Sequence, residues 1–198
     1  IGGSALGPIA VQQALNHMRY NELPAEKRGG PRFYVEDNID PARMDALFDV
    51  IDIKKTCFNV ITKSGSTSET MAQFLIIADK LKKAGVPLKD NMIATTDKAK
   101  GNLIKIAQQE GLKTFVIPDG VGGRFSEMTP VGLLGAAVCG IDIKELIAGA
   151  RYMDGLLQSE NVMENMAYLD GALQYLCMEN GINVSVMMPY ADSLKYMS

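Results

Sequence analysis

Hydrophobic and polar positions alternate along the first 117 residues in a way that predicts helices and strands in turn. Apolar residues at a spacing of three and four predict helices, and short β-branched or aromatic runs predict strands. The predicted helices are 8–20, 41–50, 67–84 and 100–110, and the predicted strands are 32–36, 57–62, 91–95 and 114–117. This order predicts an α/β fold: a three-layer αβα sandwich with a mostly parallel, doubly wound sheet.

The pattern changes after about residue 126. Three successive helices are predicted, at 127–139, 143–158 and 162–180. The last two carry methionine-rich apolar stripes, which are typical of a core or an interface. A final strand at 183–188 then restarts the α/β pattern. We therefore expect a first domain over 1–180, with its first strand truncated, and the truncated start of a second domain over 181–198.

Residues 62–70, Thr-Lys-Ser-Gly-Ser-Thr-Ser-Glu-Thr, are rich in hydroxyl groups and lie between a predicted strand and a predicted helix. The first N–H groups of a helix lack partners and lie at the positive end of its dipole. Hydroxyl donors at this point favour a binding site for a phosphate group. The alternative is an ordinary capped helix with Ser66 or Ser68 as the N-cap.

A second segment, 119–132, reads Asp-Gly-Val-Gly-Gly-Arg-Phe-Ser-Glu-Met-Thr-Pro-Val-Gly. The pair Gly122-Gly123 predicts a turn with positive φ and a close approach to a ligand. Arg124 follows, where a guanidinium group can bind an anion. Ser126 or Thr129 is expected to cap the next helix. The alternative is a Gly-Gly hairpin with a solvated arginine.

The N-terminal segment, Ile1 to Pro8, predicts a strand end, a glycine turn and the start of a helix. Gly3 and Ser4 offer amides and a hydroxyl group to a ligand. Ligands of parallel sheets bind at the carboxyl ends of the strands. We therefore expect the three loops to meet at one site.

Composition narrows the function classes. The net charge is −3 and no basic stripe is present, which argues against a nucleic acid partner. No apolar run has membrane-spanning length. The cysteines show no C-x-x-C spacing and predict buried thiols in a reducing, cytoplasmic compartment; they are Cys57, Cys139 and Cys177. One histidine and no ligand cluster argue against a metal site.

The three segments together resemble the glucose-6-phosphate isomerase family of the sugar-isomerase domain superfamily. The matching motifs are Gly-Gly-Ser-x-Leu-Gly-Pro at 2–8, the hydroxyl loop at 62–70, and Gly-Gly-Arg-Phe-Ser at 122–126 followed by Thr-Pro-Val-Gly-Leu-Leu at 129–134. Family members are more than twice as long and carry two sugar-isomerase domains. The chain is therefore expected to be a fragment.

The resemblance implies interconversion of glucose 6-phosphate and fructose 6-phosphate by ring opening and proton transfer through a cis-enediol, without a cofactor. Phosphate binding is implied for Thr62, Lys63, Ser64 and Thr67, with Lys63 acting largely through its backbone. Gly3 and Ser4 would hold the sugar phosphate from the other side. Arg124, supported by Gly122 and Gly123, would stabilise the enediolate. A homodimer is also implied.

Other catalytic groups are not expected in this chain. The family's glutamate base and ring-opening histidine are expected beyond residue 198. His17, on the first predicted helix, is expected to be solvated or hydrogen-bonded. Glu69 matches a family glutamate and either orients a catalytic group or complements the helix dipole. Glu127 departs from the family pattern, in which an apolar residue is expected, and would weaken or retune the Arg124 site.

Two other functions are considered. A non-catalytic module that senses a phosphosugar would need the hydroxyl loop but not the arginine signature. A nucleotide-binding domain is disfavoured, because neither G-x-G-x-x-G nor G-x-x-x-x-G-K-[ST] occurs. The sequence does not decide whether other sugar phosphates, such as mannose 6-phosphate, are also substrates.

Overall fold

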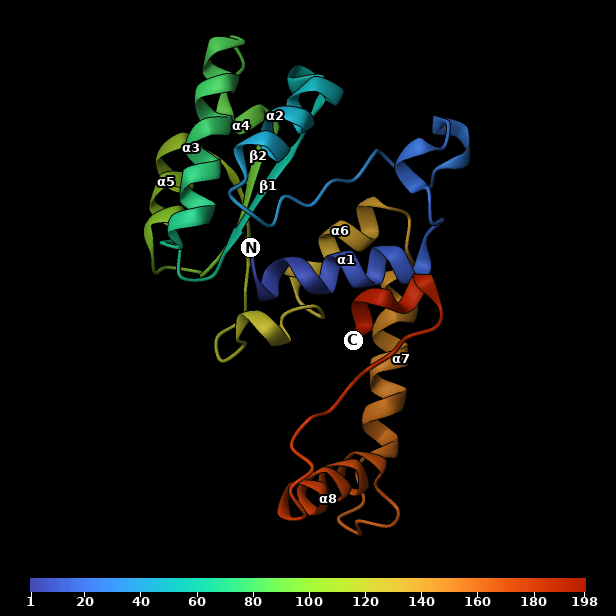
Figure 1. Cartoon of the computed structure of the whole chain (residues 1–198). Helices are drawn as coiled ribbons and strands as arrows, with labels where there is room; N and C mark the ends of the chain where they lie inside the picture. Colours follow the sequence, from blue (N-terminus) through green and yellow to red (C-terminus); the bar gives the residue numbers. More distant parts are fainter. The chain divides into compact units, whose positions relative to one another are not determined.

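The computed structural model describes residues 1–198. The chain forms two compact units, 1–141 and 142–198, which are described separately (Figure 1). The predicted division into a domain over 1–180 and the start of another stays a prediction.

A three-stranded parallel sheet lies in the first unit, in the order β1-β2-β3. Its strands are β1 (Phe58–Thr62), β2 (Met92–Thr96) and β3 (Lys113–Val116). The helices that connect them are α3 (Ser68–Lys83), α4 (Leu88–Asn91) and α5 (Asn102–Glu110). The α/β class and the parallel sheet are thus confirmed.

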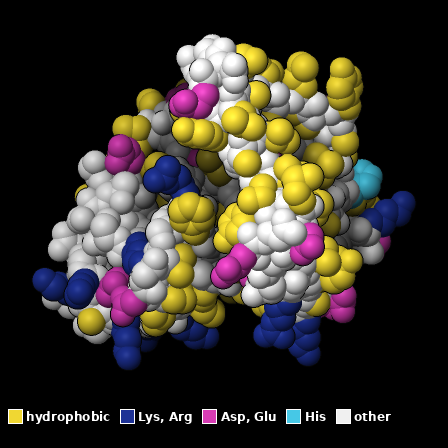
Figure 2. All heavy atoms as spheres, turned by 90° about the horizontal axis from the view of Figure 1, so that it is seen from below, with side chains coloured by type: hydrophobic (Ala, Val, Ile, Leu, Met, Phe, Trp, Pro, Cys, Tyr) yellow, Lys and Arg dark blue, Asp and Glu magenta, His cyan; other side chains and the backbone are white.

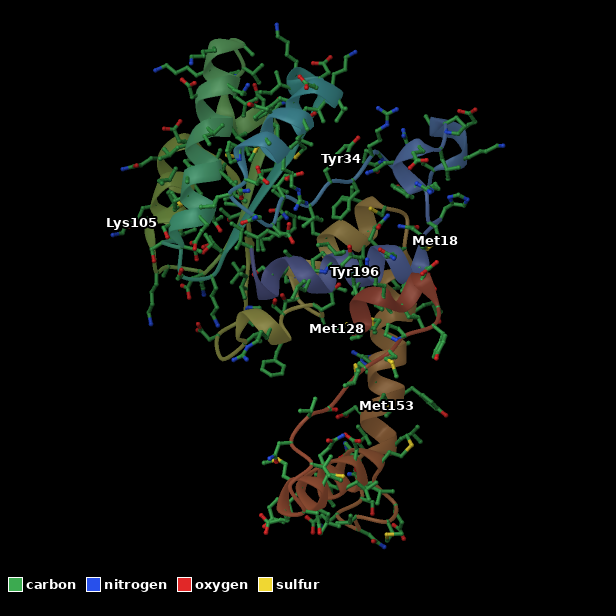
Figure 3. All side chains as sticks on the ribbon, in the orientation of Figure 1. Met18, Tyr34, Lys105, Met128, Met153 and Tyr196 are labelled. Atoms are coloured by element: carbon green, nitrogen blue, oxygen red, sulfur yellow. The ribbon has the colours of Figure 1, made fainter.

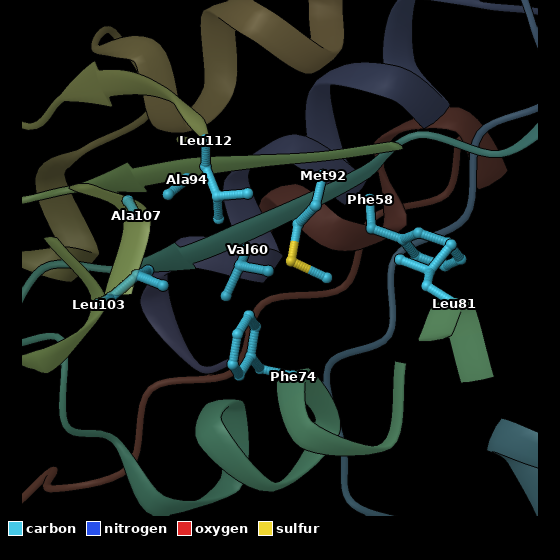
Figure 4. Packing of buried hydrophobic residues seen from close by; sticks show 9 residues of the cluster. All are labelled: Phe58, Val60, Phe74, Leu81, Met92, Ala94, Leu103, Ala107 and Leu112. Carbon is cyan, nitrogen blue, oxygen red and sulfur yellow. The ribbon is translucent and has the colours of Figure 1, made fainter. Parts of the chain in front are cut away.

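The main core lies between one face of the sheet and the helices α3 and α5. Phe58 pairs with Met92 and Val60 with Ala94, so these alternate side chains share one face. Figure 4 shows the whole cluster: Phe58, Val60, Phe74, Leu81, Met92, Ala94, Leu103, Ala107 and Leu112. Leu81 and Leu103 have no exposed surface. Burial of one such side chain contributes about 1.5–3 kcal/mol, so this face fixes the position of β1 and of the loop that follows it.

The other helices of this unit are α1 (Gly3–Leu15), α2 (Pro41–Val50) and α6 (Pro130–Val138). α1 and α6 pack against each other (Figure 1). The start of α2 follows from its sequence: Asp40 accepts hydrogen bonds from the amides of Ala42 and Arg43, and Pro41 needs no amide partner.

The second unit contains α7 (Ile143–Leu156) and α8 (Met166–Glu179), which begin after the N-caps Asp142 and Asn165. Neither helix has a buried residue. Met153, labelled in Figure 3, is 40% exposed. On α8, Leu173 and Leu176 are 53% and 54% exposed, and Figure 2 shows hydrophobic side chains at the surface of the molecule. Core packing of the methionine-rich stripes was therefore a wrong prediction, whereas an interface role stays open. No helix is long and apolar enough to cross a membrane.

Both outer predicted strands are wrong. Residues 32–36 are extended but belong to no sheet. Both backbone groups of Phe33 bond to the side chain of Asn21, at 2.7 and 2.8 Å, so an amide side chain takes the place of a neighbouring strand. Residues 183–188 are exposed and unpaired with any strand.

Two smaller predictions also need correction. The first helix spans Gly3–Leu15 rather than 8–20, with Pro8 inside it and no strand at Ile1. Only Cys139 is a buried thiol, since Cys57 is exposed and Cys177 is partly exposed. Cys57 directly precedes β1 and lies outside the core face.

Candidate functional site

Three hydroxyl groups form a small cluster where β1 ends and α3 begins. The Thr62 hydroxyl oxygen lies 3.0 Å from that of Thr67 and 3.4 Å from that of Ser64. The Ser64 and Thr67 oxygens are 3.3 Å apart. Thr62 is buried, so the last residue of the strand fixes the base of the cluster. Each group can donate or accept, which suits an incoming anion.

The first turn of α3 is free of a side-chain cap. Thr67 is the N-cap residue, but its hydroxyl makes no cap bond because it lies against Thr62. The prediction of Ser66 or Ser68 as the N-cap was therefore wrong. The amides of this turn receive no hydrogen bond from the N-cap side chain, although that of Glu69 bonds to its own carboxylate; they and the helix dipole add to the hydroxyl cluster as anion-binding groups.

Two glycines hold the hydroxyl loop against the start of α5. Since α3 begins at Ser68, the non-helical part of this loop is residues 62–67. Gly65 has φ of +65°, and a Cβ atom there would lie 2.8 Å from the Asn102 backbone nitrogen. The Gly65 carbonyl accepts a 3.2 Å hydrogen bond from the Leu103 amide. A Cβ atom on Gly101, which has φ of +95°, would overlap the Ser64 carbonyl oxygen. Only glycines permit this contact.

The arginine loop, residues 117–129, joins β3 to α6 and contains the short 3₁₀ turn η4 (Gly123–Phe125). The hairpin alternative is therefore wrong. Positive φ occurs at Gly120 and not at Gly122 or Gly123, which corrects that prediction. Thr129 caps α6 by accepting from the Val131 amide.

Lys63 connects the two loops. Its ammonium group donates to the carbonyl oxygens of Pro118, at 3.2 Å, and of Val121. The side chain is thereby committed to the arginine loop, which leaves the backbone of Lys63 as its contribution to the hydroxyl loop.

The N-terminal turn touches the arginine loop through its backbone. A Cβ atom on Gly3 would lie 2.7 Å from both the Arg124 nitrogen and the Gly123 carbonyl carbon. The glycine of the N-terminal motif is therefore required by the approach of two main chains. The sequence predicted that Gly3 and Ser4 offer amides and a hydroxyl group to a ligand, and it did not predict this contact with the arginine loop.

These three segments line an open cavity of about 250 Å³. Its lining residues are Ile1, Gly3, Ser4, Ile61, Thr62, Lys63, Ser64, Thr67, Thr70 and Gly123. Most of the predicted site residues thus lie together. Thr70 was not among them, although its position one turn after Thr67 places both hydroxyls on one helix face.

Three predicted residues lie outside the lining: Gly122, Arg124 and Glu69. Arg124 is exposed and directly follows the lining residue Gly123. Glu69 is exposed in the first turn of α3, where a hydrogen bond from its own amide, and then one from Ser68, lower the pKa of its carboxyl group. It therefore stays ionised next to the anion-binding turn.

Glu127 is the one ionisable group of the arginine loop with a strongly altered environment. Both carboxyl oxygens are buried and have no hydrogen-bond partner. Burial raises the pKa of this carboxyl group to about 7. The sequence marked Glu127 as unusual but gave no sign that it is buried.

The remaining candidate groups do not form a second site. His17 lies after the end of α1 rather than on a helix, and it accepts a 3.1 Å hydrogen bond from the Arg19 amide. No group of three potential metal ligands occurs in the described chain.

Comparisons with known proteins agree on one family. The family model described as phosphoglucose isomerase matches residues 1–198. A glucose-6-phosphate isomerase of Carboxydothermus hydrogenoformans is 60% identical over 199 residues, which cover 100% of this chain and 43% of that protein. One of Rubrobacter xylanophilus is 46% identical and is matched over 45% of its length.

Solved structures give the same picture. A hypothetical protein from Thermus thermophilus aligns with a TM-score of 0.86 at 36% identity, over 100% of this chain and 44% of that one. A glucose-6-phosphate isomerase from Chlamydia trachomatis aligns with a TM-score of 0.81 at 25% identity, over 99% and 36%. The chain thus spans less than half the length of these relatives.

Proposed function

Because the chain belongs to the phosphoglucose isomerase family, we propose that it supplies the substrate-binding part of an aldose–ketose isomerase. The proposed reaction interconverts glucose 6-phosphate and fructose 6-phosphate. The sugar ring opens, and a proton then moves between C2 and C1 through a cis-enediol. No cofactor is needed, because the reaction has no net redox change.

The hydroxyl cluster is the observation that carries this proposal. Thr62, Ser64 and Thr67 converge within 3.4 Å at an uncapped helix start, next to the backbone of Lys63. A phosphate dianion would accept hydrogen bonds from these hydroxyls and from the first amides of α3. Gly3 and Ser4 line the opposite side of the cavity and would hold the sugar.

Arg124 is the proposed stabiliser of the enediolate. It follows Gly122 and Gly123, whose backbone reaches the cavity wall, and its guanidinium is not committed to an ion pair. A fixed positive charge near C1–C2 would favour the developing negative charge more than the neutral substrate. Glu69 would either orient a reacting group or complement the dipole of α3.

The remaining roles are assigned by resemblance to the family. A glutamate base and a ring-opening histidine are expected beyond residue 198, so the chain alone is expected to be inactive. The second candidate function is a phosphosugar-binding module. One observation favours it: among the residues that line the cavity, only Lys63 has an ionisable side chain, so the lining contains no other side-chain acid or base that could move a proton of the sugar. We also propose a cytoplasmic homodimer, in which exposed apolar faces of α7 and α8 would lie at protein interfaces.

The first experiment measures thermal unfolding of this chain with glucose 6-phosphate, glucose, inorganic phosphate and ATP. A ligand that binds only the folded state raises the melting temperature by mass action. We expect a rise with glucose 6-phosphate and none with glucose. Two outcomes in a folded sample would contradict binding of a sugar phosphate by this chain. One is a rise with ATP alone, and the other is the absence of a rise with any of the four ligands.

A matched pair of variants makes the test specific. Thr67→Val keeps the shape and removes one hydroxyl of the cluster, and we expect about tenfold weaker binding of glucose 6-phosphate, from the loss of one hydrogen bond to a charged group. Thr114→Val removes an exposed hydroxyl on β3 and should leave the affinity unchanged. Equal affinities of the two variants for glucose 6-phosphate would show that the hydroxyl cluster does not bind this ligand.

A further inference from the structure

Glu127 fills a slot between two helices that only glycines leave open. A Cβ atom on Gly7 of α1 would overlap its carboxyl oxygen Oε2. A Cβ atom on Gly132 of α6 would overlap its carboxyl carbon. The carboxyl group therefore touches the backbone of both helices. Ser126 and Thr129, on either side of the pair Glu127-Met128, are buried as well, whereas Met128 (labelled in Figure 3) is 44% exposed.

Nothing charged faces this carboxyl group from the elements packed around it. α1 and α6 contain no ionisable side chain at all. On its own segment the nearest charge along the sequence is that of Arg124, which is exposed and forms no ion pair with Glu127. An ionised carboxylate without a partner is costly to bury, whereas the neutral acid is tolerated.

The slot connects directly to the arginine loop. Glu127 follows Arg124 by three residues, and α1, which forms one wall of the slot, contacts the Gly123–Arg124 peptide through Gly3. Ser126 donates a 2.6 Å hydrogen bond to the Gly123 carbonyl, which makes the segment between the two groups a tight turn. A displacement of Glu127 would therefore move the backbone of Arg124.

We propose that the neutral carboxyl group of Glu127 is a positioning group that holds the Arg124 turn against α1, and that its ionisation releases this turn. The consequence for the enediolate rests on the proposed function of Arg124. The positioning itself does not, because it concerns only the loop and the two helices.

The direction of the pH dependence follows from linkage. The pKa of Glu127 is raised to about 7 in the folded chain by burial, against about 4.3 in an unfolded one. The folded state therefore binds the proton more tightly. The contribution of the protonated Glu127 side chain to the free energy of unfolding is complete below the pKa of the unfolded chain. It is lost as the pH rises through the pKa of the folded chain. We expect the Arg124 turn to loosen between about pH 6 and pH 8.

The test is a titration of this chain without any sugar, by NMR of glutamate labelled with ¹³C at the carboxyl carbon. The resonance that disappears in Glu127→Gln is that of Glu127. We expect it to titrate near pH 7, and the exchange protection factor of the Phe125 amide, which bonds to the Gly122 carbonyl, to fall at least tenfold over the same range. Protection factors correct for the intrinsic pH dependence of exchange.

Three variants distinguish the effect of the neutral Glu127 carboxyl group on the Arg124 turn from a change in the stability of the whole chain. Glu127→Gln should keep the Phe125 amide protected at both ends of the range. Gly132→Ala should lower that protection at every pH, because the methyl group displaces the carboxyl. Glu110→Gln, an exposed glutamate on α5, should behave like the unsubstituted chain.

Two results would overturn the proposal: a Glu127 resonance that titrates at the ordinary glutamate value of about 4.3, or constant Phe125 protection while Glu127 titrates. The exchange protection of the Phe125 amide is measured in the unsubstituted chain, so constant protection between pH 6 and pH 8 would overturn the proposal even if a variant does not fold. Because no ligand is present, failure of glucose 6-phosphate binding would leave these readouts unchanged.

Discussion

The hydroxyl loop and the arginine loop border the same cavity but are held in different ways. The hydroxyl loop is held by its own hydroxyls and by backbone contacts at the start of α5, where Gly65 meets Asn102 and Ser64 meets the N-cap residue Gly101. The arginine loop depends on groups from elsewhere: the Lys63 ammonium group, the Gly3 backbone and the slot that receives Glu127. The first loop is stabilised locally, and the second is assembled from distant parts of the chain.

This difference separates binding from chemistry in the proposed enzyme. A phosphate group needs a receptor that exists before the ligand arrives, and under this proposal the hydroxyl loop would provide one. Arg124 needs a position relative to the reacting carbons, and that position depends on α1, α6 and Lys63. Changes to the arginine loop should therefore affect turnover, whereas changes to the hydroxyl loop should affect affinity.

The largest effect is expected for Arg124→Ala. Activity requires a complete protein, so the test uses a chimera in which this chain replaces the matching region of the Carboxydothermus hydrogenoformans relative. Loss of one group that stabilises developing negative charge lowers kcat by about 10²–10³-fold. We expect this loss in steady-state kinetics with fructose 6-phosphate, with KM changed by less than about threefold.

The control for this prediction is Arg151→Ala, an exposed arginine on α7, which should leave kcat unchanged. If Arg124→Ala instead raised KM and kept kcat, Arg124 would be a binding group, and the contrast between the two loops would be wrong.

The sequence predicted the part of the fold that depends on short-range pattern. Between Pro41 and Val116 the strands and the helices α2, α3 and α5 lie within a few residues of their predicted bounds, because their apolar periodicity coincides with a core shared by β1, α3 and α5, whereas the short helix α4 was not predicted. The extended segment around Phe33 was misassigned, because its partner is the side chain of Asn21. A strand pattern cannot reveal whether a second strand exists.

The site shows the same limit. The three motifs identified most of the cavity lining, because hydroxyl and glycine patterns are local. The motifs could not show that Gly3 meets the Gly123–Arg124 peptide, nor that Gly7 and Gly132 enclose Glu127. The contacts of Gly3 and Gly7 join residues more than a hundred positions apart, and that of Gly132 depends on how the loop before α6 turns back. They determine how the arginine loop is held.

A moderate effect is expected for Gly3→Ala. The new methyl group would lie 2.7 Å from backbone atoms of Gly123 and Arg124, so two main chains must separate. Overpacking of this kind costs about 1–3 kcal/mol. We expect that loss in the free energy of unfolding measured with urea, together with lower exchange protection in residues 122–126 and unchanged protection in 64–70.

The matched control is Gly149→Ala, in the interior of α7, where a Cβ atom meets nothing within 4 Å. Alanine is favoured over glycine in a helix by about 0.5–1 kcal/mol, so this variant should be more stable. Equal stabilisation by Gly3→Ala would show that the N-terminal turn does not touch the arginine loop.

The smallest effect is expected for Lys63→Met, which removes the link between the loops and keeps the apolar stem. The two carbonyl acceptors lie close to solvent, so water replaces the ammonium group and the global cost should be about 1 kcal/mol or less. The local effect should be larger: exchange protection around Val121 should fall, while that of the Leu103 amide, bonded to the Gly65 carbonyl, should not.

The matched control is Lys105→Met on α5, where Lys105 is labelled in Figure 3. It removes an exposed charge that links no loops, and it should change neither the stability nor the exchange protection of these amides. A parallel loss of protection in both loops would mean that they form one cooperative unit, and the distinction between a self-supported and an assembled loop would then not hold.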